Sequence, residues 1–365
     1  MKTLLNRYLK IIDWYIIKKY LGTFIFTLML FIVISVVFDI SEHMDNFLTK
    51  GATLKQIVFQ YYAGFVPFYM DLLSPMINFI AVIYFTAKMA SQTEVVPILS
   101  GKVTFARFLR PYFVAASVIF LVSFFAKVYL IPYTNKLKLD FENTHGFYGD
   151  ASKNDIHLQL DSNTYVYVQS YDANTHTGYM FSLEKFSGDV LKQKLVATNI
   201  VYDSVKRVWT FKNYTVRYIN GLKEHLTPSQ MQKDTVLDLR PSDLVVNNNY
   251  PAMSLSELNK NIAKVKFSGA GDLKDMENEK YRRFIYPLSS FVLMLIGVSV
   301  SARKVRGGIG LPLGIGLFLC FAYVVVDKFS VVFALKTSLP PLVGAFIPNL
   351  VFGILGLYLL YKAPK

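Results

Sequence analysis

Residues 88–111, KMASQTEVVPILSGKVTFARFLRP, lie between two long apolar runs and differ from both. The segment contains four basic residues and a single acid, Glu94. A short basic loop between membrane-length segments is expected in the cytoplasm. Ser91 and Glu94 have the spacing of a capping box and precede a short apolar run, so they predict a small helix over about residues 91–100. We expect another protein to bind the chain at this helix.

The whole chain has the composition of a membrane protein with one additional domain. Of its 365 residues, 53% are hydrophobic, which is too many for an ordinary soluble domain. Residues 1–20 alternate bulky apolar and basic side chains and predict an interfacial helix that continues into the first span. The apolar runs have the length that a bilayer requires. They predict six transmembrane helices, at about residues 21–38, 65–87, 112–132, 284–302, 309–335 and 339–361.

The net charge of +14 is concentrated in short segments next to apolar runs. Residues 1–20, 88–111, 302–308 and 362–365 together hold 14 basic residues and two acids, and so carry +12 of the +14. This distribution is the positive-inside pattern and predicts that both termini lie in the cytoplasm. It does not indicate a nucleic-acid-binding protein, because the rest of the chain is nearly neutral.

The composition changes between residues 133 and 280. Apolar runs become short, many alternate with period two, and turn formers such as Ser187-Gly188-Asp189 and Asn220-Gly221 separate them. This pattern predicts an all-β domain built as a sandwich, a jelly roll or an open barrel. Because three spans precede it, the domain is expected outside the inner membrane. A linking helix is expected at about residues 253–265, and the predicted domains are 1–132, 133–280 and 281–365.

No segment has the pattern of a catalytic, cofactor or metal site. The run 307–316, GGIGLPLGIG, lacks the Gly-Lys-Ser/Thr ending of a phosphate-binding loop, and close helix packing through small residues explains it better. The five histidines have no metal-ligand spacing, and the single cysteine, Cys320, lies in an apolar run. We therefore expect no enzyme activity, no cofactor and no metal. Any energy source that the protein uses must then come from a partner protein or an ion gradient.

Basic residues near the outer ends of the spans run against the positive-inside trend. They would converge near the outer surface if the spans form one bundle, and could then attract a phosphorylated lipid headgroup. Pairing with acids such as Asp140, Glu142, Glu279 and Asp327 explains them equally well. The candidates for headgroup binding are Lys127, Lys136, Lys328, Arg282 and Arg283.

Alternating apolar residues of the β domain have two interpretations. Val166, Val168, Phe181 and Trp209 could line a groove for acyl chains, or they could form the core of the domain. The edges of an open β domain have a separate use, because a strand from another protein can extend them.

Several motifs resemble the permease subunits of the lipopolysaccharide exporter, the LptF/LptG (YjgP/YjgQ) family. They are DWYIIKKYLGTF at residues 13–24, SQTEVVPILSG at 91–101, FLRPY at 108–112, MSLSEL at 253–258 and EKYRRFIYPLSSFVLMLIGVSVSAR at 279–303. The resemblance covers essentially the whole chain, and the first motif is more similar to the LptG side of the family. It implies six transmembrane helices with a periplasmic, jelly-roll-like β domain between the third and the fourth.

The resemblance also implies a function and partners. Two such permeases would form a heterodimer over two copies of a separate ATPase, take lipopolysaccharide from the inner membrane between the first and fifth spans, and pass it to a periplasmic bridge protein. By position in the motif, Glu94, Val95, Ile98 and Leu99 would contact the ATPase, the carboxylate pairing with an arginine. Gly101 comes one place earlier than in many relatives. Two alternatives remain open, a transporter driven by an ion gradient and a periplasmic scaffold that moves no lipid.

Overall fold

A computed structural model of the chain gives two compact units. It describes residues 10–49, 51–101, 104–145, 153–172, 175–204, 206–244, 249–268, 273–302 and 308–362. The helical unit comprises Met1–His145, Pro251–Leu255 and Glu277–Lys365, and the β unit comprises Gly146–Tyr250 and Ser256–Met276.

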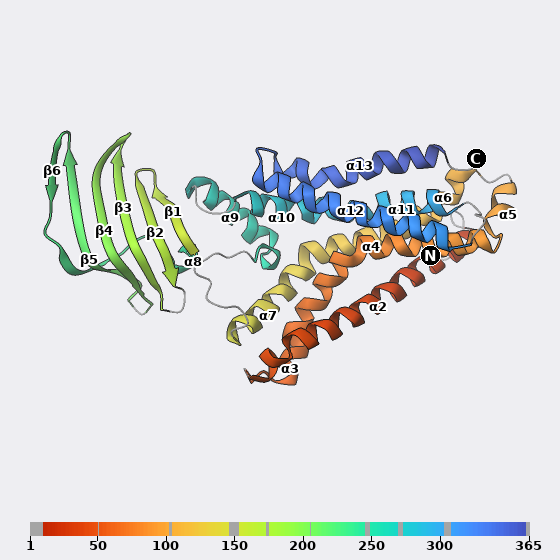
Figure 1. Cartoon of the computed structure of the whole chain (residues 1–365), viewed down its shortest axis with the longest axis horizontal. Coiled ribbons are helices and arrows are strands. Elements are labelled where there is room, and N and C mark those ends of the chain that lie inside the picture. Colours follow the sequence, from red (N-terminus) through yellow and green to blue (C-terminus); the bar gives the residue numbers. More distant parts are fainter. Residues whose placement is uncertain are drawn as a thin grey trace. The chain divides into compact units, whose positions relative to one another are not determined.

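Six stretches among the described residues are long and apolar enough to cross a membrane, as predicted. Three lie before the β unit and three after it. The first is α2 (Ile11–Thr49), the second joins α3 (Leu54–Gln56), η1 (Ile57–Tyr61) and α4 (Tyr62–Ser91), and the third joins α6 (Phe105–Phe125), η2 (Ala126–Leu130) and α7 (Ile131–Thr144). The last three are α10 (Leu273–Ile285) with η4 (Tyr286–Leu288) and α11 (Ser289–Ser301), then α12 (Gly310–Lys336) and α13 (Pro341–Tyr361). The short helix α5 (Val95–Ser100) lies in the loop between the second and third stretches (Figure 1).

The helices run further than the apolar runs that predicted them. The third stretch continues to Thr144, twelve residues beyond the expected end of the span at 132. Its last part, α7, is rich in Lys, Asp, Glu and Asn and has a polar average, so hydropathy alone placed it in the β domain. The chain keeps its helical hydrogen bonds after the apolar stretch ends, because composition limits the span and not the helix.

Aromatic stacking and small residues hold the helical unit together. The rings of Tyr20 and Phe85 stack at 5.6 Å between centroids, and Phe85 stacks on Tyr112 at 5.4 Å. In the glycine-rich run, Gly316 packs directly against Ile83, so a larger residue there would clash with α4. This contact agrees with the packing interpretation of that run.

Asn78, one of the polar residues within the second span, is fully buried. Asn78 accepts a hydrogen bond from the Tyr20 hydroxyl at 2.5 Å and donates one to the Ser290 carbonyl at 3.1 Å. Its amide thus joins α2, α4 and α11. This arrangement favours helix packing over a polar path for solutes at this position.

The β unit is one antiparallel sheet in which each strand from β1 to β6 pairs with the next strand along the chain (Figure 1). The strands are β1 (Lys153–Asp161), β2 (Thr164–Asp172), β3 (Thr177–Ser187), β4 (Val190–Asp203), β5 (Val208–Asn220), β6 (Lys223–Leu226) and β7 (Gln230–Thr235). Strand β6 pairs with one end of β5 and β7 with the other, so the two share one edge of β5. The all-β prediction is confirmed, and the strand order of the described residues is a meander. The helices α8 (Pro241–Leu244) and α9 (Leu255–Ser268) follow, with η3 (Tyr250–Ala252) between them.

The hairpin turns form where the turn-forming residues predicted them. Gly188 and Gly221 have φ angles of +60° and +62°, a region that glycine adopts without a steric penalty. At the first hairpin, the backbone N–H of Asn163 donates to the Asp161 carboxylate at 2.8 Å. This bond, together with the Thr164 side chain, lowers the pKa of Asp161 below its usual value of 3.8.

Candidate functional site

The helix predicted over residues 91–100 is shorter than expected and begins at Val95. Ser91 is the last residue of α4, and its hydroxyl donates to the Lys88 carbonyl at 2.8 Å. Glu94 is the N-cap residue of α5, but its side chain makes no capping hydrogen bond. The capping-box prediction was wrong because α4 continues for one turn into the loop and takes Ser91 with it.

The Glu94 carboxylate is bound by a residue far away in the sequence. The Tyr15 hydroxyl, on the first turns of α2, lies 3.0 Å and 3.2 Å from its two oxygens. Lys19 lies one helical turn further along α2, with its amine 5.0 Å from the centre of the Tyr15 ring. Glu94 is partly exposed, so its carboxylate can accept a further donor from another protein.

The other predicted contact residues of α5 do not all face outward. Val95 is only 1% exposed and belongs to the core of the helical unit, and Ile98 is half-buried against that core. The side chain of Leu99 lies outside the described residues. Among the side chains of this helix that the structure describes, Val96 and Pro97 are the exposed apolar ones. The sequence did not single out Val96, because six residues are too few to show a helical period.

A partly buried ion pair joins the first turn of α6, just after the loop that contains α5, to the start of α2. The Arg107 guanidinium contacts both oxygens of the Asp13 carboxylate, at 2.8 Å and 2.6 Å. Asp13 is 3% exposed and also accepts the backbone N–H of Lys10 at 2.7 Å. The side chain of Thr104 caps α6 by accepting the backbone N–H of Arg107, which fixes the first turn from which the guanidinium extends.

Acids of the same chain pair with Lys127 and with both arginines predicted to bind a lipid headgroup. Lys127 lies 2.7 Å from Asp71, a carboxylate that also accepts the Ser123 hydroxyl at 2.6 Å. The Lys127 amine also lies 4.4 Å from the centre of the Tyr286 ring. The alternative prediction of acid partners did not name Asp71, because Asp71 is 56 positions away in sequence.

The two arginines have the partners that the acid-pairing interpretation named. Arg282 contacts both oxygens of Asp327 at 2.9 Å, and Arg283 contacts Glu279 at 3.0 Å. Arg283 is 2% exposed and also donates to the Met253 carbonyl at 2.9 Å. The remaining two candidates, Lys136 and Lys328, are exposed.

The four residues predicted to line a groove in the β unit lie together in its core. Val166, Val168, Phe181 and Trp209 are at most 2% exposed and belong to one hydrophobic cluster. The indole N–H of Trp209 donates to the Leu239 carbonyl at 2.7 Å. In this structure these side chains pack against one another, and their contact with acyl chains stays a prediction.

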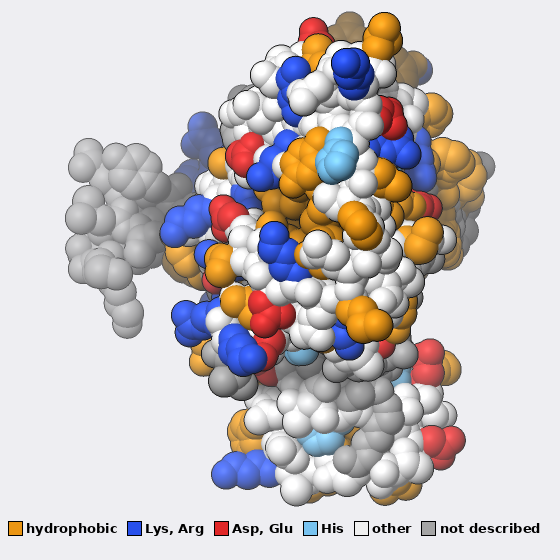
Figure 2. Space-filling model, turned by 90° about the vertical axis from the view of Figure 1, so that its left-hand side faces the viewer, with side chains coloured by type: hydrophobic (Ala, Val, Ile, Leu, Met, Phe, Trp, Pro, Cys, Tyr) orange, Lys and Arg blue, Asp and Glu red, His pale blue; other side chains and the backbone are white. Residues whose placement is uncertain are grey.

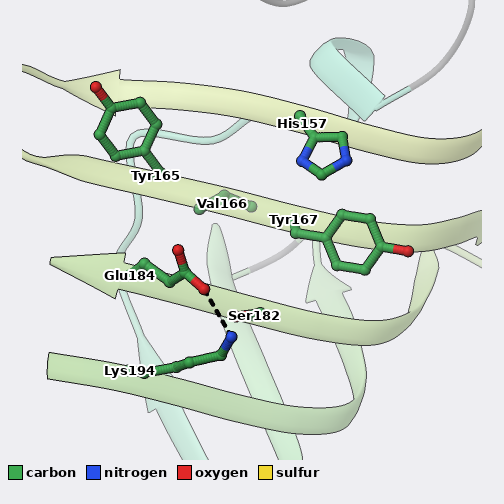
Figure 3. A pocket seen from close by; sticks show the side chains of 7 residues that line it. All are labelled: His157, Tyr165, Val166, Tyr167, Ser182, Glu184 and Lys194. Atoms are coloured by element: carbon green, nitrogen blue, oxygen red, sulfur yellow. Dashed lines mark ion pairs between the residues drawn. The ribbon is translucent and has the colours of Figure 1, made fainter. Parts of the chain in front are cut away.

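The opposite face of the sheet carries a shallow pocket of about 280 Å³ that the sequence did not indicate. Figure 3 shows rings from β1 and β2 on one side of it and an ion pair between β3 and β4 on the other. His157 and Tyr167 have ring centres 4.7 Å apart, and Glu184 lies 2.7 Å from Lys194. Ser182, between them, is buried, and its hydroxyl has no hydrogen-bond partner in the part of the chain that the structure describes.

The charges on the β unit do not form a patch of one sign on the face drawn in Figure 2. Lys and Arg side chains alternate there with Asp and Glu side chains, with hydrophobic side chains between them. A surface that binds a nucleic-acid backbone would gather the basic residues instead. Across the described ranges, no group of three or more His, Cys, Asp and Glu side chains is placed to hold a metal ion.

The family model described as lipopolysaccharide export system permease LptF/LptG matches residues 14–362. The chain belongs to the LptF/LptG family. The LptG proteins of Escherichia coli strain K12 and of strain O6:H1 are each 26% identical to it over 209 residues. That alignment covers 55% of this chain and 56% of each relative, so the chain spans about half the length of the curated relatives it matches.

Membership confirms the resemblance that the motifs indicated, including the similarity to LptG. Proteins of the LptF/LptG family are permeases of the lipopolysaccharide export system, and a permease is a transport subunit and not a catalytic enzyme. Six apolar helices with a β sheet inserted after the third agree with the fold of this family.

Proposed function

We propose that this chain is the transmembrane permease subunit of an ATP-driven exporter that extracts lipopolysaccharide from the inner membrane and passes it to a periplasmic bridge. The observation that carries the proposal is the family match over residues 14–362, which includes every apolar span and the β unit. The chain would work with a second permease of the same family and two copies of an ATPase.

The dependence on a separate ATPase is supported by the surface of α5. A partly exposed carboxylate, Glu94, stands next to the exposed apolar pair Val96 and Pro97. Proteins commonly bind one another through an apolar residue that fills a groove of the partner. A neighbouring carboxylate then pairs with an arginine of the partner. The sequence of the glycine-rich run lacks the Gly-Lys-Ser/Thr ending of a phosphate-binding loop, and its last glycine, Gly316, is packed against Ile83 within the bundle.

The lateral entry of lipid between the first and fifth spans is supported by their exposed apolar faces. Only 17% of the most apolar window of α2 and 28% of that of α12 are buried within the chain. Val33 on α2 and Val325 on α12 are both half or more exposed. Such faces need lipid or another apolar protein surface as a neighbour.

The transfer to a bridge protein is supported by the open edge of the sheet. Among the described strands, β1 pairs only with β2, so its other side offers backbone donors and acceptors to an added strand. The charge distribution of the sequence supports cytoplasmic termini and a periplasmic β unit. The core residues Phe181 and Trp209 would contact acyl chains only if the sheet opens.

Photo-crosslinking tests the proposal directly. A photoreactive residue at Val33 or Val325 should give an adduct with lipopolysaccharide in native membranes, and purification should recover an ATPase. A probe at Ile119, which is buried at 4% exposure, is the matched control and should give none. Adducts absent from both exposed positions would favour a scaffold. An intact transporter without any nucleotide-binding partner would favour an ion gradient.

A further inference from the structure

Two polar contacts attach the start of α2 to the loop on both sides of α5. Glu94 comes immediately before α5 and binds Tyr15, and Arg107 comes in the first turn of α6 and binds Asp13. The two α2 residues are only two positions apart. The short helix is therefore enclosed between two contacts to the same helix end.

The contact after α5 is the stronger of the two. The Asp13–Arg107 pair is bidentate, and the carboxylate is 3% exposed. A charged pair with two parallel hydrogen bonds is held in one geometry, and removing either member leaves a charge out of water without a partner. Such a pair resists separation when one of the two helices is pushed.

The contact before α5 orients a functional group. The Tyr15 hydroxyl reaches both oxygens of Glu94, while the Tyr15 ring itself is 39% exposed. An exposed hydrogen bond of this kind adds little stability. Its effect is to restrict the rotamers of Glu94 before a partner binds, which lowers the entropy cost of binding.

Apolar packing fills the space between the two contacts. Val95 from α5, Ile16 from α2 and Phe105 from α6 lie in one core cluster, each less than 9% exposed. The start of α2, the helix α5 and the start of α6 thus form one packed body. Because α2 continues unbroken for 39 residues, it is about 58 Å long at 1.5 Å per residue, and most of that length lies beyond this body.

We propose that the Asp13–Arg107 ion pair and the Tyr15–Glu94 hydrogen bond transmit movement of α5 to α2, with Tyr15 as a positioning residue for Glu94. The inference rests on the proposed function, in which an ATPase binds α5. It adds the route by which movement driven by the ATPase would reach α2, the span whose apolar window is least buried within the chain. The far end of the same helix is anchored at Asp39, which accepts the hydroxyls of Tyr61 and Tyr62 at 3.0 Å and 2.9 Å.

The test uses the complete complex with its ATPase, reconstituted in liposomes. Spin labels at Val33 on α2 and Leu350 on α13, in a Cys320→Ala background, report whether nucleotide moves α2. Arg107→Met removes both hydrogen bonds of the pair. It should leave ATPase binding and hydrolysis near the parent level and reduce lipopolysaccharide release, and the fraction of complexes in which α2 moves, by about tenfold. Asp13→Asn keeps an acceptor for the Lys10 N–H and should have the same effect. The double variant should be no worse than either single variant.

Two further variants make the outcome decisive. Arg110→Met removes an exposed basic residue three positions from Arg107 and should transport normally. Tyr15→Phe removes only a hydroxyl, so it tests the proposal even if Arg107→Met fails to assemble. It should weaken ATPase binding severalfold and should also lower release when the ATPase is saturating. Parent-like release and parent-like movement of α2 in Tyr15→Phe and Asp13→Asn would overturn the inference and leave the proposed function standing. A parent complex without ATPase or nucleotide response would overturn the proposed function itself.

Discussion

The Lys127 amine lies 2.7 Å from the Asp71 carboxylate, so a base predicted to attract a lipid phosphate is paired within its own chain. The Ser123 hydroxyl also donates a hydrogen bond to the Asp71 carboxylate, and the Lys127 amine lies over the Tyr286 ring. This ion pair joins α4 to η2, and the aromatic contact continues to η4. The contact between Lys127 and the Tyr286 ring therefore joins the first membrane half to the second.

Asp71→Asn should destabilise the chain, because the substitution leaves the charge of Lys127 without its partner. Lys127 remains 20% exposed, so we expect a loss of about 1–3 kcal/mol and not the larger value for a fully buried pair. Thermal unfolding in detergent measures the change. The double variant Asp71→Asn/Lys127→Met should recover part of the loss, and Lys328→Met, at an exposed position, is the control. Equal stability of Asp71→Asn and the parent would show that the pair contributes nothing.

Val96 and Val95 should behave in opposite ways although they are adjacent. Val96→Glu places a charge on the exposed side of α5 and should abolish recovery of the ATPase while the melting temperature stays unchanged. Val95→Ala removes buried methyl groups and should cost about 1–2 kcal/mol while the ATPase still binds. Co-purification and thermal unfolding of both variants measure the two effects. The reverse result would place the binding surface on the other side of this helix.

Trp209→Phe should weaken the β unit specifically. The substitution keeps a ring in the core and removes the indole donor, so the buried Leu239 carbonyl loses its hydrogen bond. We expect a cost of about 1–2 kcal/mol. Faster proteolysis within the β unit, with the melting of the helical unit unchanged, measures it. Tyr165→Phe, at an exposed position on the other face of the sheet, serves as the comparison, and the protease should cleave it at the parent rate.

Asp161 should contribute to the stability of the first hairpin only above acid pH. Hydrogen bonds from the Asn163 backbone and the Thr164 side chain lower its pKa in the folded chain below the usual 3.8. A depressed carboxyl pKa means that the stabilisation is complete above pH 3.8 and is lost as the pH falls through the folded value. Hydrogen exchange of the β1–β2 hairpin, followed in the parent and in Asp161→Asn, measures this. The parent should lose protection on acidification, and the variant, which lacks the titrating group, should change less over the same pH range.

The sequence predicted the elements better than the contacts between them. Apolar length located the six spans and period-two alternation located the sheet, because both signals act within a few neighbouring residues. The Tyr15–Glu94 and Asp13–Arg107 contacts join residues 79 and 94 positions apart, and no local signal connects such residues. The start of α5 was predicted at the wrong residue for a related reason. A Ser-x-x-Glu spacing is the same whether the Ser begins a new helix or ends the previous one.

The site residues show the same limit. A basic side chain near the end of a span looks alike in sequence whether it faces a lipid or an acid on another helix. The sequence offered Asp327 as one of several acids, and the fold shows that its partner is Arg282. In a six-residue helix, burial of Val95 and exposure of Val96 depend on which side meets α2 and α6. That information is in the packing and not in the composition of the segment.

The order of the strands has a consequence for how the chain becomes folded. Each strand from β1 to β6 pairs with its immediate successor, so every loop that must close is short. Sheets with such local pairing form faster than sheets whose partners are distant in sequence. During synthesis the β unit can therefore assemble hairpin by hairpin. It can be complete before α11, α12 and α13 have been made, so the first three apolar stretches would at that stage still lack the helix contacts that these later helices supply.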